Sequence, residues 1–215
     1  MLKTICLALV GLIFLALSLH TVIRIIRYFW KFPMPEFAAN IIDNPVRRLI
    51  QPPEKMPIRH GVKPDMKVLE VGPGNGTYTV ATARAVGDGG QVVSIDIEPK
   101  MIKRVIKRIQ EEGINNIDAQ VADVFDLPFE EGTFDLIYMI AVIGEIPTPE
   151  RALSEFYRVI KPTGNLAFSE LLMDPDYPLA TNLVQLAESV GFQLKNNLGG
   201  FVSYTVEFEK REGRK

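Results

Sequence analysis

Residues 68–79 read VLEVGPGNGTYT, and this stretch decides the fold that the sequence predicts. Val68–Val71 has the composition of a buried β-strand, and a glycine-rich turn follows at once. A helix that begins at Thr77 leaves its first N–H groups free to bind an anion, and the glycines let the backbone pass close to a ligand. The spacing G-x-G-x-G differs from the G-x-G-x-x-G of dinucleotide-binding enzymes. A plain tight turn between strand and helix is therefore the alternative interpretation.

Outward from this turn, strand-like and helical segments alternate along the chain. Strands are predicted at 67–71, 91–97, 117–121, 134–140 and 165–171, and helices at 77–86, 99–112, 149–160 and 178–190. Two further strands, 192–195 and 201–209, flank a turn region at Gly199 and Gly200. Such alternation is typical of a parallel α/β sheet. We predict an α/β fold, a doubly wound, mostly parallel seven-stranded sheet with an antiparallel C-terminal strand pair, preceded by one transmembrane helix.

The charge of the chain is divided unevenly between two parts. The 215 residues include 24 Lys and Arg and 26 Asp and Glu, a formal net charge of −2 that argues against a nucleic-acid partner. Residues 1–31 contain no acidic side chain and four basic ones, Lys3, Arg24, Arg27 and Lys31. Cys6 is the single cysteine, which excludes disulfide frameworks and thiolate metal sites within the chain, and we expect no metal site.

The N-terminal part has the length and composition of a membrane span. Residues 4–23 contain no charged side chain, and a helix of that length covers roughly 30 Å, about one hydrocarbon core. Tyr28 and Trp30 then lie among basic residues, as interfacial anchors do. The cations after the span outnumber those before it, which favours a cytoplasmic location for the rest of the chain. We therefore expect a single-pass membrane protein that contacts the lipid bilayer through residues 4–23.

A cleaved signal peptide is the alternative interpretation of the same segment. Ala16 and Ser18 stand at plausible −3 and −1 positions before a cleavage site. The apolar run continues past Ser18, however, whereas secretory apolar regions are usually about 7–15 residues long. We therefore favour a retained anchor.

A proline-rich connector follows at residues 32–63. Proline breaks long helices, so short ones are predicted, one from Pro45 to Ile50 with Asn44 as its N-cap and one from Pro53 to His60. Apolar side chains in this segment indicate that it packs on something. Arg47 and Arg48 either contact lipid phosphates or form a solvated basic turn.

Acidic side chains stand where three strands end. Asp96 ends the second strand, 20 residues after Gly76, where a carboxylate can accept hydrogen bonds from both ribose hydroxyls. Asp123 follows the third strand and can accept from the exocyclic amine of an adenine, and Glu70 adds negative charge beside the glycine turn. With the anion-binding turn, these acids match a ligand that has a carboxylate, a cationic centre, a ribose and an adenine. S-adenosylmethionine is such a ligand.

Residues 64–170 resemble the class I S-adenosylmethionine-dependent methyltransferases, particularly the ubiquinone/menaquinone C-methyltransferases and phospholipid N-methyltransferases. The resemblance rests on VLEVGPGNGTYT (68–79), VVSIDIEPKMI (92–102), ADVFDLPFEEGTFDLIYM (122–139) and RALSEFYRVIKPTGNLAFSE (151–170). It implies S-adenosylmethionine as cofactor, bound by Glu70, Gly72, Pro73, Gly74, Asn75, Gly76, Asp96, Ile97, Met101, Asp123, Val124, Met139 and Ile140. The domains are then an anchor (1–31), a connector that covers the pocket (32–63), a methyltransferase domain (64–210) and a tail (211–215).

The chain departs from this branch just after the fourth strand. Relatives often carry a pair of histidines there, whereas this chain has Gly144 and Glu145 in AVIGEIP. Methyl transfer is an in-line displacement that needs a base only if the acceptor must lose a proton. Glu145 is our candidate catalytic residue. Other candidates are Glu170, Tyr177 and His60. His60 is more simply interpreted as a favourable cation at the C-terminal end of a helix. We interpret Asp174 and Asp176 as turn formers and Tyr204 as a half-buried strand residue.

The segment that covers the pocket indicates the kind of acceptor. The segment between Leu171 and Pro178 is short, so the connector must serve as cover, and the connector also leaves the membrane. We therefore expect a lipid-like or other small-molecule acceptor, with a phospholipid head group or an isoprenoid quinone favoured. A soluble or protein substrate, or a catalytically idle cofactor-binding scaffold, are the alternatives. A nicotinamide dehydrogenase is poorly supported by the glycine spacing, and the sequence does not predict the oligomeric state.

Overall fold

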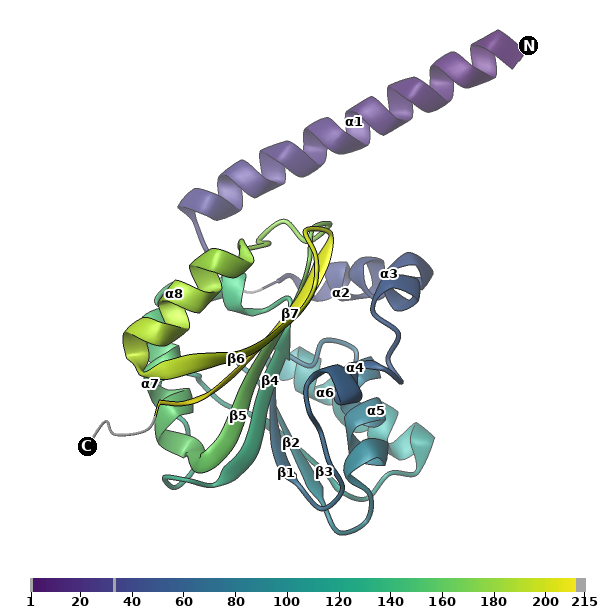
Figure 1. Ribbon diagram of the computed structural model, residues 1–215. Coiled ribbons are helices and arrows are strands. Elements are labelled where there is room, and N and C mark those ends of the chain that lie inside the picture. The colour runs from purple at the N-terminus through teal and green to yellow at the C-terminus, as the bar shows by residue number, and fades with distance from the viewer. Residues whose placement is uncertain (1, 33, 212–215) are drawn as a thin grey trace.

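The protein is described by a computed structural model that covers residues 2–32 and 34–211, so most of the predicted tail lies outside the described residues. Within them, seven strands form one sheet in the order β3-β2-β1-β4-β5-β7-β6 (Figure 1). The strands are β1 (Lys67–Val71), β2 (Gln91–Asp96), β3 (Ile117–Val121), β4 (Phe134–Ile140), β5 (Ile160–Leu171), β6 (Phe192–Gly199) and β7 (Ser203–Lys210). β1 to β5 run parallel, and β7 is antiparallel to both β5 and β6. The predicted seven-stranded, mostly parallel sheet with an antiparallel C-terminal pair is confirmed.

Helices cover both faces of the sheet. α5 (Thr77–Val86) and α6 (Pro99–Glu112) pack near β2 and β3, and α7 (Pro149–Val159) and α8 (Ala180–Val190) cover the other face (Figure 1). Side chains alternate along β4, so Ile137 and Met139 join the core under α7 and α8, while Leu136 and Tyr138 join the core beside α5. Because both faces are covered, the central strands are apolar almost throughout.

Several element boundaries differ from the sequence prediction. β6 extends past the predicted residue 195 to Gly199, because it pairs with β7 along that length; β7 begins at Ser203, and α8 begins at Ala180. β5 begins at Ile160, directly after α7, because Ile160 pairs with Phe134 of β4. The last connector helix, α4, is limited to Met56–Arg59, because the N–H groups of Lys55 and Met56 both donate to the carbonyl of Pro52 in a turn that precedes it.

The rest of the connector forms two short helices, α2 (Glu36–Ile42) and α3 (Pro45–Ile50). The predicted cap of α3 is confirmed, since the Asn44 side chain accepts a hydrogen bond from the Arg47 N–H at 3.0 Å. Both helices lie beyond the carboxyl ends of the parallel strands (Figure 1).

The N-terminal helix, α1 (Leu2–Phe29), projects away from the domain, with its C-terminal turns against it (Figure 1). By length and composition, Val10–Phe29 can cross a membrane, with a mean hydropathy of 1.8, and 6% of this segment is buried. The segment begins later than the predicted span at 4–23. A signal sequence near the N-terminus can also meet this criterion of length and hydropathy.

The order of strands reverses beside β1, which has β2 on one side and β4 on the other. At such a point the connections leave toward opposite faces of the sheet and open a crevice at the carboxyl ends of the strands. This crevice positions the site.

Candidate functional site

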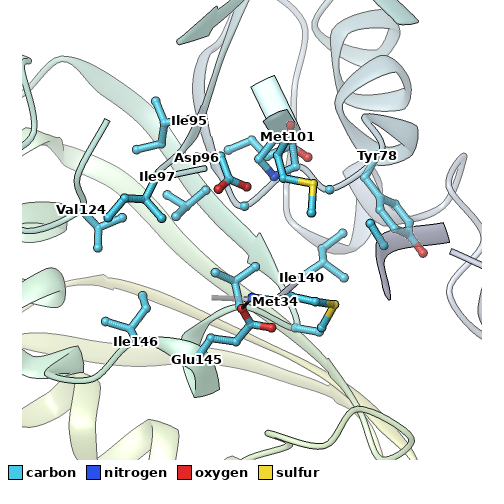
Figure 2. A pocket seen from close by; sticks show the side chains of 18 of the residues that line it. Met34, Tyr78, Ile95, Asp96, Ile97, Met101, Val124, Ile140, Glu145 and Ile146 are labelled. Carbon is cyan, nitrogen blue, oxygen red and sulfur yellow. Dashed lines mark hydrogen bonds between the residues drawn. The ribbon is translucent and has the colours of Figure 1, made fainter. Parts of the chain in front are cut away.

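A cavity of about 320 Å³ lies at this reversal point. Its lining comes from the β1–α5 turn, the end of β2, the segment after β3, the loop after β4, the connector and Asp174 of the β5–α8 loop. Figure 2 shows Asp96, Ile97 and Met101 across the cavity from Met34, Glu145 and Ile146. The cavity therefore has two walls, which we call the strand-end wall (residues 70–78, 95–101 and 122–125) and the connector wall (Met34 to Arg47 with the loop 140–147).

The glycine turn of the strand-end wall has the backbone that close approach requires. Gly72 and Gly74 both have positive φ, +71° and +56°. A Cβ on Gly72 would lie 2.5 Å from Val142 Cγ2, so a side chain there would collide with the loop after β4. A Cβ on Gly74 would have no atom within 4 Å, so the backbone at Gly74 is open to a ligand.

Three acids of this wall are held in different ways. Glu70 is buried and accepts a hydrogen bond from Ser94 Oγ at 3.0 Å, and its burial raises its pKa. Asp96 Oδ1 accepts from the Glu98 N–H at 2.9 Å, and burial raises the pKa of Asp96 to about 6. Asp123 Oδ1 accepts from the Phe125 N–H at 2.9 Å and is exposed. All three line the cavity.

Most of the residues proposed from the sequence as cofactor contacts lie together on the cavity lining. They are Glu70, Gly72, Pro73, Gly74, Asn75, Asp96, Ile97, Met101, Asp123, Val124 and Ile140, and the candidate base Glu145 lies there too. Two lie elsewhere. Gly76 caps α5 beside Val105 and Arg108, and Met139 is buried on the opposite face of β4 from Ile140.

The connector wall contains residues that the sequence analysis did not single out as site residues. Met34, Ala39, Ile42, Asp43 and Arg47 all line the cavity. Asp43 Oδ2 accepts from Thr77 Oγ1 at 2.6 Å, and the Ala39 carbonyl accepts from Asn75 Nδ2 at 3.3 Å, so the connector lies on the glycine turn. Apolar side chains in a proline-rich segment were the only sequence signal for this packing.

Arg47 is neither a lipid contact nor a solvated residue, which corrects both predicted interpretations. It is buried and forms a two-pronged ion pair with Asp174, with Nη1 and Nη2 at 2.9 and 3.2 Å from the two carboxylate oxygens. Asp174 also forms a turn, as predicted, because its N–H donates to Leu171 and its carbonyl accepts from Tyr177. Arg48, by contrast, is half-exposed and pairs with Asp43 at 2.7 Å.

A second buried ion cluster joins the end of α1 to the cavity. Arg27 is only 4% exposed, although it was predicted to lie at the membrane interface. It pairs with Asp176, and its Nη2 lies 3.4 Å from Glu145 Oε1, while the Met34 N–H donates to Glu145 Oε2 at 3.0 Å. Burial raises the pKa of Glu145 to about 8, and the neighbouring Arg27 opposes that rise.

The remaining candidates lie outside the cavity lining. His60 is buried, stacks on Tyr138 and shares a hydrogen bond of 2.8 Å with Ser169. Burial lowers the pKa of His60 to about 3, so the prediction that His60 is a cation at a helix end is wrong. Tyr177 donates to the Phe201 carbonyl. Glu170 and Tyr204 are buried, so the prediction of a half-buried Tyr204 is also wrong.

Within residues 2–32 and 34–211, no group of three His, Cys, Asp or Glu side chains is arranged to hold a metal ion.

Comparison with known proteins identifies a family and several relatives. A family described as "Methyltransferase domain" matches residues 62–199. The "Ubiquinone/menaquinone biosynthesis C-methyltransferase UbiE" of Idiomarina loihiensis is 31% identical over 144 residues, which cover 66% of this chain and 56% of that protein. The protein of the same description from Haemophilus ducreyi is 31% identical over 148 residues, 68% and 56% of the two chains. The chain thus spans just over half the length of these curated relatives.

Solved structures share the fold. A SAM-dependent methyltransferase from Aquifex aeolicus aligns with a TM-score of 0.76 and 24% identity, covering 82% of this chain and 98% of that one. A putative S-adenosyl-L-methionine-dependent methyltransferase from Methanococcus maripaludis aligns with a TM-score of 0.69 and 18% identity, covering 86% and 97%. At these identities the likeness concerns the fold alone.

Proposed function

Because the chain belongs to the methyltransferase-domain family, whose cofactor is S-adenosylmethionine, we propose that it is a membrane-anchored enzyme that methylates a lipid-like acceptor. The observation that carries this proposal is the two-walled cavity. One wall has the glycine turn and the strand-end acids, and the other is built by the segment that leaves α1. We further propose that α1 is retained as a single-pass anchor with the domain on the cytoplasmic side.

The strand-end wall fits S-adenosylmethionine by its chemistry. Gly74 leaves its backbone open to a ligand, and the N-terminus of α5 offers N–H groups for the methionine carboxylate. Asp96 would accept from the ribose hydroxyls, with Ile97 and Met101 against the adenine and Asp123 at its polar edge. Arg47 is paired with Asp174, so the excess of acids in the lining suits a cationic ligand.

When bound, S-adenosylmethionine supplies a methyl group on a positively charged sulfur. The work of the protein is to orient the acceptor in line with that group and to exclude water. Ile140, Ile146 and Met34 give the opposite side of the cavity an apolar surface for an acceptor. Glu145 lies among them, and a pKa of about 8 makes it able to take a proton near neutral pH from an acceptor that must lose one.

Three observations together support a lipid-like acceptor. The cavity is largely apolar on the connector wall, α1 has the length and composition of a membrane span, and the relatives quoted above are named for ubiquinone and menaquinone biosynthesis. An isoprenoid quinone ring therefore ranks ahead of a phospholipid head group.

The test uses the full-length protein in mild detergent, methyl-labelled S-adenosylmethionine and a lipid extract of the native membrane. We expect enzyme-dependent label in the organic phase, and S-adenosylhomocysteine, but not NADH, should suppress it. Label confined to the aqueous phase or to protein would contradict a lipid-like acceptor. Cofactor binding without any transfer of label would instead favour an idle scaffold.

A further inference from the structure

A second apolar surface lies outside the cavity, at the end of the domain that faces α1. It consists of side chains from the β5–α8 loop, the end of β6 and the β6–β7 turn that are between 41% and 67% exposed, namely Met173, Leu179, Leu198, Phe201 and Val202. We call this surface the hairpin patch. In Figure 1 both segments lie at the end of the sheet nearest the C-terminal turns of α1.

The segments that form the hairpin patch carry no charge over long stretches. Residues 196–206 read NNLGGFVSYTV and residues 177–187 read YPLATNLVQLA, without a Lys, Arg, Asp or Glu in either. The two acids of the β5–α8 loop, Asp174 and Asp176, are paired with Arg47 and Arg27. Surface turns usually carry polar side chains, because their backbone is solvated. A turn tip that exposes Phe201 and Val202 side by side marks an interaction surface.

The backbone under the patch is paired within the protein. Tyr177 Oη donates to the Phe201 carbonyl at 2.6 Å, and the Leu172 N–H donates to the Val202 carbonyl at 2.8 Å. The Gly200 N–H donates to the Ser203 carbonyl at 2.9 Å. Because these backbone groups already have partners, the free-energy cost of moving the β6–β7 turn from water into a lipid interface is lower.

The patch is continuous with the end of α1. Arg24 Nη1 donates to the Leu172 carbonyl at 3.3 Å, and the same Leu172 bonds to Val202 across the loop. Arg27 pairs with Asp176 of the same loop. A bilayer that contains α1 would therefore meet the hairpin patch next.

We propose that the hairpin patch enters the bilayer interface beside α1, so that the domain contacts the membrane through two elements. This rests on the anchor assigned to α1 under the proposed function. Met173 in the patch is followed directly by Asp174, which lines the cavity beside Arg47, so the loop that contacts lipid also borders the site. A lipid-like acceptor would then reach the cavity from the bilayer without crossing water.

The test measures the depth of a tryptophan in the full-length protein reconstituted in phosphatidylcholine and phosphatidylglycerol vesicles. Trp30 is the single tryptophan, so Trp30→Phe gives a silent background for Phe201→Trp. Lipids brominated near the head-group end of their acyl chains should roughly halve its emission, because interfacial side chains reach about 5–10 Å below the surface. The matched control is Ile106→Trp on α6, which is 41% exposed and lies away from α1, and its emission should not change.

Flotation of the same vesicles separates the two proposals. Protein that floats with the vesicles but shows equal emission for the tryptophan at 201 in plain and brominated lipid would overturn the hairpin contact and leave the anchor intact. Such a result would point to a protein partner or a second copy as the occupant of the patch. Protein that does not float would overturn both the anchor and the hairpin contact. Val202→Trp, which tests the neighbouring position, should be quenched like Phe201→Trp, and it decides the question if Phe201→Trp does not fold.

Discussion

The strand-end wall and the connector wall of the cavity meet at the same ligand space but are held in place differently. In the strand-end wall, Gly72, Gly74 and Asp96 stand at or just after the ends of hydrogen-bonded parallel strands, which fix them locally. The connector wall is held instead by side chains that bond across the fold, as in the Arg47–Asp174 and Arg27–Glu145 contacts.

This difference separates the two halves of the reaction. The wall we assign to the cofactor is part of the sheet, whereas the wall we assign to the acceptor depends on a few buried ion pairs. Such pairs add little net stability against an apolar replacement, but the removal of one partner leaves an unpaired buried charge at a high cost. The connector wall should therefore be the more easily disrupted of the two.

The largest effect is expected for Arg47→Ala, which leaves Asp174 buried without its partner. The free energy of unfolding should fall by about 3–5 kcal/mol. Arg48→Ala is the matched control, because Arg48 is 43% exposed and its partner Asp43 keeps a hydrogen bond from Thr77, and it should cost less than about 1 kcal/mol. Denaturant unfolding of the full-length protein in detergent measures both, and equal losses would contradict the dependence of the connector wall on its buried ion pairs.

Asp96→Ala should weaken S-adenosylhomocysteine binding while the fold stays intact. The loss of charge-assisted hydrogen bonds to the ribose costs about 2–3 kcal/mol, which corresponds to a roughly 30- to 150-fold higher Kd. Calorimetric titration measures it, with Asp88→Ala, an exposed acid at the other end of β2, as control. An unchanged Kd for Asp96→Ala would contradict the proposed contact between Asp96 and the ribose.

Glu145 makes the acceptor side testable by pH. If Glu145 takes a proton from the acceptor, kcat should rise about tenfold from pH 7 to 9, because a carboxyl group with a pKa of about 8 becomes ionised in that range. Glu145→Gln should abolish this rise, whereas Glu150→Gln, an exposed acid on α7, should retain it. The same pH profile in wild type and Glu145→Gln would show that Glu145 is not the base.

The smallest effect is expected for the pH dependence of stability, which tests whether His60 is buried as a neutral side chain beside Ser169. The pKa of His60 is about 3 in the folded protein and near 6.5 when unfolded, so the unfolded chain binds the extra proton as pH falls below 6.5. Stability is therefore retained above pH 6.5 and should decline by about 1 kcal/mol from pH 7 to 5.5. His60→Gln should lose this contribution to the pH dependence. An identical slope in both proteins would mean that His60 is not buried as a neutral group.

The strand-end wall could be predicted from the sequence because its signals are local. A β-rich run, a glycine turn and an acid at the next strand end all follow from short-range patterns, and they place Gly74 and Asp96 on one crevice. Met139 was predicted to contact the cofactor together with Ile140, but successive side chains of a strand point to opposite faces. Ile140 therefore lines the cavity, whereas Met139 is buried in the core.

The connector wall could not be predicted, because its partners are far apart along the chain. Arg47 lies 127 residues from Asp174, and Arg27 lies 149 residues from Asp176. Each arginine taken alone resembles a membrane-interface or solvated cation, and each aspartate resembles a turn former. Their pairing depends on how α1 and the connector pack against the loop after β5. The hydrophobic periodicity of the sequence does not predict this packing.

The most direct measurement is the position of S-adenosylhomocysteine in a structure of the full-length protein in detergent micelles. We predict that its ribose hydroxyls contact Asp96, its adenine lies by Ile97 and Val124, and its sulfur faces Glu145 and Ile146 of the connector wall. A ligand bound elsewhere, or bound at the glycine turn with the connector displaced from the cavity, would contradict the assignment of one wall to the cofactor and the other to the acceptor.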